Sequence, residues 1–238
     1  MWRKIKDEIL NRGDKFVIAV SGGLDSMFAL DFFEQLVKVS NISIIVATFD
    51  HDDHPESAKF CTFVEEYCRT RHITCVSGKG YTNREEFMKQ GGVEAMHRLQ
   101  RYKFLKDILD RYDYDAVVTG HHLNDQIETI LLRLFRGYPH KYLTMVNSSN
   151  FYVYRPFLKV SRAKIKNHAT NRGLSWLDDP TNDTDMYERN WIRNTILPQI
   201  LEKRNVVKSM SKGMAKNEDI DGYISNMLST NQFYEEDP

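Results

Sequence analysis

The sequence predicts an α/β fold: a parallel five-stranded sheet with helices on both faces, followed by a C-terminal helical extension. Short apolar runs alternate with segments of helical periodicity up to about residue 155, which is typical of repeated strand–helix–strand units. The 238 residues are 41% hydrophobic and 12% aromatic, which is enough for a sizeable core and excludes a wholly disordered chain. We expect a main domain at 1–185 and a helical extension at 186–238.

The strands are expected where short apolar runs occur. Phe16–Val20 is apolar at every position, as in a buried parallel strand. The predicted strands are Phe16–Val20, Ile42–Phe49, Ile73–Val76, Asp115–Thr119 and Phe151–Tyr154. Helical spacing predicts helices over Leu24–Val37, Pro55–Arg71, Val93–Leu109, Leu123–Phe135, Ser161–Asn171, Tyr187–Lys203 and Val206–Leu228.

Composition argues against several classes of protein. No run approaches the roughly 18 consecutive apolar residues of a membrane span, and the N-terminus lacks the apolar core of a signal peptide, so we expect a cytoplasmic protein. Cys61, Cys68 and Cys75 form no Cys-x-x-Cys pair, which favours buried thiols over a zinc, iron–sulfur or dithiol site.

The formal net charge is zero, with 33 Lys+Arg and 33 Asp+Glu, but the charges are unevenly distributed. Residues 155–216 hold 13 basic and 6 acidic residues, a balance of +7, whereas residues 217–238 hold 0 and 6, a balance of −6. A local basic surface is sufficient for phosphate contacts, so the net charge does not exclude a nucleic-acid partner.

The segment Ser21–Ser26 follows the first predicted strand and opens a helix, with the sequence Ser-Gly-Gly-Leu-Asp-Ser. Its two glycines permit a tight turn, and amide groups at a helix start favour an anion such as pyrophosphate. Asp25 is a poor partner for bare phosphate and therefore suggests a bridging Mg²⁺. The segment lacks the ending of a Walker motif, and a plain turn with an Asp helix cap is the less favoured interpretation.

Three further groups share helix faces. Asp125 and Glu128 are three residues apart after the fourth predicted strand, where they either bind a cationic substrate or complement a helix dipole. Spacing alone leaves these two interpretations even. The second group is Glu94, Arg98 and Arg101, and the third is Arg189 and Arg193. Each could meet phosphate, although a solvated charged face is the more ordinary interpretation of either group by itself.

Taken in order, these segments resemble a known family. Ser21–Ser26 resembles the signature of the PP-loop, N-type ATP pyrophosphatase superfamily, which has a Rossmann-like, adenine nucleotide alpha hydrolase-like fold. The further segments resemble the tRNA(Ile)-lysidine synthase family, in a short form without its larger C-terminal domains. They are His51, Glu94–Tyr102, His121–Thr129, Arg155–Leu158 with Ser161 and Arg162, and Asp178–Pro198. The family usually continues Gly-Leu-Arg after His51, whereas this chain reads Asp52-Asp53-His54.

The resemblance implies a ligase that uses ATP and Mg²⁺ to join free L-lysine to C2 of the wobble cytidine of tRNA(Ile) with a CAU anticodon. Adenylation of the cytidine would release pyrophosphate, and attack by lysine would release AMP. The implied catalytic residues are Asp25, Asp125 and Glu128, with Mg²⁺ near Asp25. The implied ATP-binding residues are Ser21, Gly22, Gly23, Leu24, Asp25, Ser26, His51 and His121. The implied lysine-binding residues are Asp125, Glu128 and Arg98, and the implied tRNA or phosphate contacts are Arg101, Arg189, Asn190 and Arg193.

Two alternatives stay open at this point. One is another PP-loop enzyme that modifies tRNA or forms an amide, although a cytidine thiolase would be expected to show paired cysteines. The other is a protein that binds ATP and tRNA without catalysing a reaction.

Overall fold

The computed structural model describes residues 1–53, 56–89, 92–138, 145, 152–178, 188–203 and 206–209. The chain divides into two compact units that interleave along the sequence. The sheet unit comprises Met1–Gly120, Asn147–Pro156 and Ile165–Asp178, and the helical unit comprises His121–Val146, Phe157–Lys164 and Asp179–Pro238. Most of the predicted helix Val206–Leu228 and the acidic C-terminal segment lie outside the described residues.

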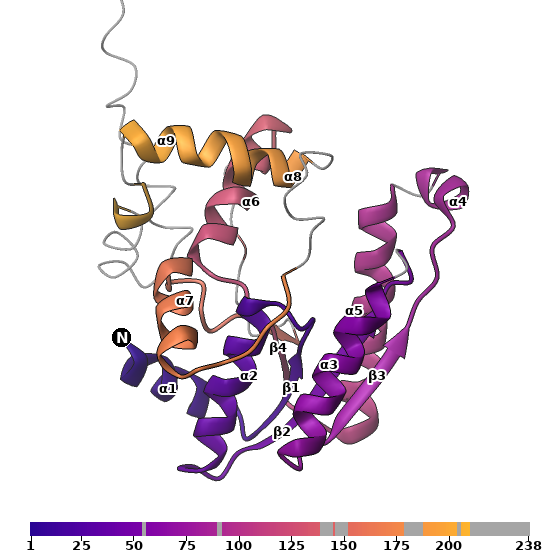
Figure 1. Cartoon of the computed structure of the whole chain (residues 1–238), viewed down its shortest axis with the longest axis vertical. Helices are drawn as coiled ribbons and strands as arrows, with labels where there is room; N and C mark the ends of the chain where they lie inside the picture. The colour runs from indigo at the N-terminus through magenta and orange to yellow at the C-terminus, as the bar shows by residue number, and fades with distance from the viewer. Residues whose placement is uncertain are drawn as a thin grey trace, which may run out of the picture. The chain divides into compact units, whose positions relative to one another are not determined.

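The sheet unit contains the predicted five-stranded parallel sheet, in the order β3-β2-β1-β4-β5 (Figure 1). Its strands are β1 (Lys15–Ala19), β2 (Ser43–Asp50), β3 (Cys75–Lys79), β4 (Ala116–Val118) and β5 (Val153–Tyr154). Strand β1 lies in the middle of the sheet between β2 and β4, with Val17 opposite Ile45 and Val117. This central position agrees with the burial of its apolar residues Phe16–Ile18.

Strand β3 lies further along the chain than predicted. Ser77, Gly78 and Lys79 lie beyond the predicted strand Ile73–Val76, but they pair with the end of β2. A Cβ atom at Gly78 would lie 2.6 Å from the ring of Phe104, so glycine is needed here because an aromatic ring packs against the strand. The Ser-Gly sequence therefore marks close packing within the strand.

Helices cover both faces of the sheet. The helices before β4 are α1 (Trp2–Leu10), α2 (Leu24–Val37), α3 (Ser57–Thr70), α4 (Arg84–Lys89) and α5 (Val93–Tyr112). The Phe16 ring packs edge-on against Phe33 of α2 at 5.2 Å, whereas the neighbouring Val17 belongs to a core cluster with Leu105 and Ile108 of α5. Because successive strand residues face opposite sides, α2 and α5 lie on opposite faces of the sheet.

The remaining helices are α6 (Leu123–Phe135), α7 (Arg162–Asn171), α8 (Glu188–Trp191) and α9 (Leu197–Lys203). A π-helical turn over Ile192–Ile196 joins α8 to α9. In the helical unit, Leu123 and Ile127 of α6 form an apolar cluster with Leu197 of α9. None of the helices in the described ranges is long and apolar enough to cross a membrane.

Candidate functional site

The loop at the carboxyl end of β1 is shaped by its two glycines and two serines. Gly22 has a φ of +83°, a left-handed conformation that favours glycine, and Gly23 is the N-cap of α2. The Ser21 amide donates to Ser26 Oγ at 3.1 Å, and that hydroxyl donates to the Gly23 carbonyl at 2.9 Å. Among the described residues no side chain caps α2. The helix dipole at this first turn favours an anion.

Gly120, which follows β4, packs against this loop, and the sequence analysis did not predict this contact. A Cβ atom at Gly120 would lie 2.5 Å from the Asp25 carbonyl oxygen and 3.1 Å from the Ser26 amide nitrogen. The chain leaving β4 thus passes directly against the first turn of α2. A glycine immediately after a predicted strand was the available signal, because close backbone approach requires a residue without Cβ.

His51 follows β2, and its imidazole is held neutral. Burial, Arg101 and His97 lower the pKa of His51 to about 4. Its ring stacks on His97 at a centroid distance of 4.7 Å. Thr82 Oγ1 donates to the His51 carbonyl at 3.0 Å and lies 2.7 Å from His97 Nε2. A neutral ring at this position can stack on a base or share a hydrogen bond, but it offers no charge to a phosphate near neutral pH.

Arg98 and Arg101 of α5 lie around one tyrosine. The guanidinium carbon of Arg98 is 4.7 Å from the centre of the Tyr102 ring, and that of Arg101 is 5.5 Å away. Burial favours a raised pKa for Tyr102, but Arg98, Arg101 and Arg155 together hold this pKa below its usual value. Arg155, which directly follows β5, belongs to this basic cluster, although the sequence analysis gave it no role. Three cations around one polar ring suit an anionic ligand.

The start of α6 is fixed by a reciprocal cap. His122 Nδ1 accepts a hydrogen bond from the Asp125 amide at 3.3 Å, and Asp125 Oδ2 accepts one from the His122 amide at 2.8 Å. Leu123 and Ile127 bury the apolar side of the helix. Asp125 and Glu128 are themselves buried, with exposed fractions of 8% and 1%.

The structure brings together four residues that the sequence assigned to two ligands. Arg193 donates from Nε to Glu128 Oε1 at 2.9 Å and from Nη2 to Oε2 at 2.8 Å. Arg189 donates from Nε to Glu128 Oε2 at 3.1 Å and from Nη2 to Asp125 Oδ1 at 3.2 Å. Arg193 Nη2 also reaches Asp125 Oδ1 at 3.4 Å. We call Asp125, Glu128, Arg189 and Arg193 the α6 cluster.

The negative and positive charges of the α6 cluster balance one another. Burial favours a raised pKa for Asp125, but His122, Arg189, His121 and a backbone hydrogen bond lower it below its usual value. Two carboxylates are therefore balanced by two guanidinium groups. His121, a predicted ATP contact, acts here on the charge of Asp125, and Asn190 lies half-buried between the two arginines in the sequence.

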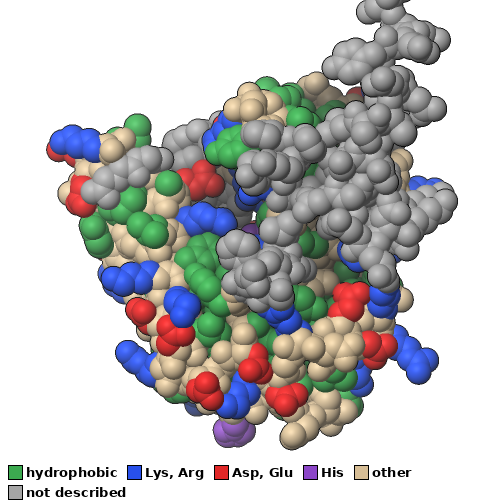
Figure 2. All heavy atoms as spheres, turned by 180° about the vertical axis from the view of Figure 1, so that it is seen from behind, with side chains coloured by type: hydrophobic (Ala, Val, Ile, Leu, Met, Phe, Trp, Pro, Cys, Tyr) green, Lys and Arg blue, Asp and Glu red, His purple; other side chains and the backbone are tan. Residues whose placement is uncertain are grey.

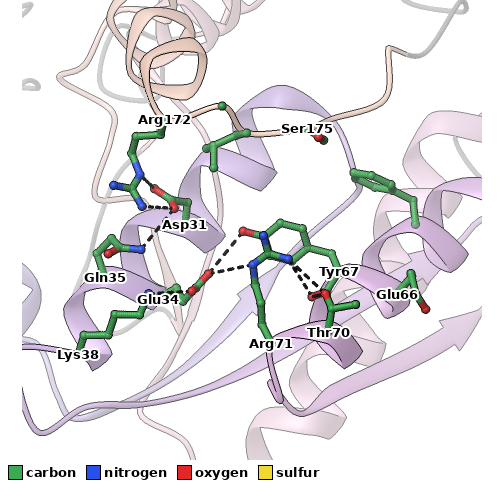
Figure 3. A pocket seen from close by; sticks show the side chains of 13 residues that line it. Asp31, Glu34, Gln35, Lys38, Glu66, Tyr67, Thr70, Arg71, Arg172 and Ser175 are labelled. Carbon is green, nitrogen blue, oxygen red and sulfur yellow. Dashed lines mark hydrogen bonds and ion pairs between the residues drawn. The ribbon is translucent and has the colours of Figure 1, made fainter.

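Asp31 and Arg172 line a pocket of about 350 Å³ in the sheet unit (Figure 3). Arg172 donates to both oxygens of the buried Asp31, at 2.7 and 2.9 Å, and His168 lies 3.6 Å from the same carboxylate. Lys38 and Arg71 of the pocket wall both pair with Glu34. We call Asp31, Arg172 and His168 the α2 cluster. On the face of the molecule seen in Figure 2, acidic and basic side chains are interspersed over the described surface.

Comparison with known proteins places the chain among PP-loop proteins. The PP-loop domain family matches residues 2–200. The chain is 34% identical over 205 residues to the tRNA(Ile)-lysidine synthase of Geobacillus kaustophilus. The aligned residues make up 83% of this chain and 44% of that protein. It is 36% identical over 195 residues to the tRNA(Ile)-lysidine synthase of Streptococcus mutans. This alignment makes up 79% of this chain and 42% of that protein. The chain thus spans less than half the length of these two relatives.

The fold is also seen in a solved structure. A U34-tRNA thiolase from Methanococcus maripaludis superimposes with a TM-score of 0.72 over 99% of this chain and 82% of its own, at 14% sequence identity. This likeness confirms the parallel α/β fold that the sequence predicts.

Proposed function

The chain belongs to the PP-loop domain family, and from that premise we propose that it is a tRNA(Ile)-lysidine synthase. The proposed reaction joins free L-lysine to C2 of the wobble cytidine of a CAU-anticodon tRNA at the expense of ATP. The observation that carries this proposal is the buried carboxylate pair Asp125 and Glu128, because a lysine side chain is a cation that such a pair can hold. The similarity to curated synthases, which extends over both units, supports it.

In the first step, O2 of the cytidine attacks the α-phosphate of ATP and pyrophosphate leaves. The amides of the Ser21–Ser26 loop are suited to hold the pyrophosphate, because they lie at the start of α2. Asp25 in that first turn fits a Mg²⁺ held by one carboxylate together with phosphate oxygens. Bound Mg²⁺ would neutralise the charge that develops on the phosphates.

In the second step, the ε-amine of lysine forms a bond to C2, AMP leaves with the O2 oxygen, and the amine loses a proton. A lowered pKa makes Asp125 a good counter-ion for the ammonium group and a weak base. We therefore assign Asp125 mainly to binding and orienting the amine. The resemblance implies a lysine contact for Arg98, but Arg98 shares the Tyr102 ring with Arg101 and Arg155. We therefore propose all three arginines for phosphates of the nucleotide or the tRNA.

The test is incorporation of labelled lysine into a CAU-anticodon tRNA transcript with ATP and Mg²⁺. We expect label with the wild-type chain, no label when the wobble cytidine is replaced by uridine, and no pyrophosphate release from the Asp25→Asn variant. A full-length curated synthase serves as the positive control. Absence of label from the wild-type chain under conditions in which that control is active would overturn the proposal.

A further inference from the structure

We propose that the two arginines of the α6 cluster have different tasks. Arg193 is a positioning residue that stays on Glu128, whereas Arg189 is a temporary counter-ion that the ammonium group of the amine substrate displaces. This inference rests on the proposed function, because it concerns how the same carboxylate pair takes up lysine. It assigns to Arg189 a share in substrate selection.

Charge balance requires one arginine to leave when a cationic substrate binds. Asp125 and Glu128 are buried carboxylates, and each needs a cationic or hydrogen-bonding partner. Arg189 and Arg193 supply two positive charges for two negative ones. A substrate ammonium at the same carboxylates would place three cations on two anions in a largely buried site. Like charges disfavour that arrangement, so one guanidinium group must withdraw.

The two arginines contact the carboxylates with unequal geometry. Arg193 grips both oxygens of Glu128 at 2.9 and 2.8 Å, which is the bidentate arrangement that binds carboxylate most strongly. Arg189 makes single, longer contacts of 3.1 and 3.2 Å to Glu128 and Asp125. It therefore bridges the two acids at the position where one ammonium, with its three donors, could bond to both. Arg189 is the weaker and better-placed group to exchange.

The local backbone also differs between the two arginines, whereas their exposure does not. The side chains of Arg189 and Arg193 are 26% and 27% exposed, so either could turn away from the buried carboxylates. Arg193 lies within the π-helical turn Ile192–Ile196, whereas Arg189 lies in the four-residue helix α8 before it. Widened turns of this kind occur frequently at functional sites. A rotamer change at Arg189 would free its guanidinium for a phosphate without moving Arg193.

The exchange predicts that the site is specific for a cationic substrate. A substrate must bring a positive charge to replace that of Arg189, so a neutral side chain of the same length cannot compete. Norleucine, which carries a methyl group where lysine carries its ammonium, is the matched ligand. We expect saturable binding of lysine and none of norleucine at equal concentration.

The experiment measures lysine binding by calorimetry and KM and kcat for tRNA labelling in a pair of matched variants, Arg189→Met and Arg193→Met. Both keep the apolar stem and remove the charge. For Arg189→Met we expect lysine to bind about 10-fold more tightly, since a competitor is gone, with a lower KM and a lower kcat. For Arg193→Met we expect binding about 10-fold weaker, because Glu128 loses its bidentate anchor. Arg189→Lys retains a competing cation and should restore an affinity near that of the wild type.

A second measurement uses the wild-type chain and is independent of whether a variant folds. Phenylglyoxal modification of each arginine is followed by mass spectrometry with and without lysine. We expect lysine to increase the modification of Arg189 and to leave that of Arg193 unchanged. If the wild type binds no lysine and labels no tRNA, the proposed function fails. If it binds lysine but Arg189 is not released, or if both methionine variants shift affinity in the same direction, the inference alone is overturned.

Discussion

Two regions of the molecule use the same pair of chemical groups in different ways. In the α2 cluster, one buried carboxylate, Asp31, is gripped at both oxygens by Arg172 across 141 residues of sequence. In the α6 cluster, two buried carboxylates share two arginines unequally across 61 to 68 residues. The first arrangement is saturated and leaves nothing to exchange, so it fastens the chain leaving α7 to α2. The second keeps one loosely held cation over two acids, which suits a site that takes up a charged substrate.

The largest expected effect separates the two clusters by activity. Glu128→Gln removes a charge that holds the substrate ammonium and leaves Arg193 without its bidentate partner. We expect the rate of lysine transfer to tRNA to fall by about 10³-fold, because truncating one partner of a buried charge pair leaves the others uncompensated. Asp31→Asn is the matched control in the α2 cluster, and its rate per folded molecule should stay close to that of the wild type. Equal losses in the two variants would show that the clusters do not differ in function.

The next effect separates the clusters by stability. Arg172→Met leaves Asp31 as a buried charge with a much weaker partner, and we expect the free energy of unfolding in urea to drop by about 3 kcal/mol. The double variant Asp31→Asn with Arg172→Met should recover part of this loss, because it no longer buries a charge. A loss in the double variant equal to the sum of the two single losses would contradict the pairing.

A smaller effect is expected on the stability of the protein at acid pH, and it comes from the single residue His51. Burial and neighbouring cations lower the pKa of His51 to about 4, so the folded state excludes a proton that the unfolded chain binds below pH 6.5. Stability from this residue is present above pH 6.5 and is lost as the pH falls from there toward 4. His51→Asn should flatten this part of a denaturation profile.

At lower pH, Asp125 of the α6 cluster contributes to the pH dependence of the free energy of unfolding. The pKa of Asp125 is lowered in the folded state, so its stabilising effect is present above its unfolded pKa near 4 and is lost at lower pH. Arg189 is one of the groups that lower this pKa. Urea denaturation in the His51→Asn background should therefore show the acid loss of stability beginning at higher pH when Arg189→Met is added. An unchanged profile would indicate that Arg189 does not hold Asp125 ionised.

The two clusters also mark where sequence reasoning succeeds and where it stops. The strands and the Ser21–Ser26 loop were predictable because runs of apolar residues and a strand–turn–helix pattern are local signals. The helix Trp2–Leu10 was not predicted, although Ile5 and Ile9 bury one face of it. The shared faces of Asp125 with Glu128 and of Arg189 with Arg193 were readable from spacing. That these faces bind each other was not, because no local rule pairs side chains more than 60 residues apart.

The smallest expected effect concerns an exposed ion pair that contrasts with both buried clusters. Asp52 has a φ of +55° and pairs with Lys79 at 2.9 Å, with side-chain exposures of 50% and 61%. Glycine adopts a left-handed conformation without strain, so Asp52→Gly loses a weak exposed ion pair and regains a comparable amount of stability from the backbone.

We therefore expect Asp52→Gly to change the free energy of unfolding by less than about 0.5 kcal/mol. Asp52→Ala loses the same pair but keeps a Cβ atom in the left-handed conformation, so it should cost about 1 kcal/mol more than the glycine variant. Urea denaturation of both variants measures the difference. If Asp52→Gly destabilises the protein as much as Arg172→Met does, burial is not what distinguishes the two clusters from surface ion pairs.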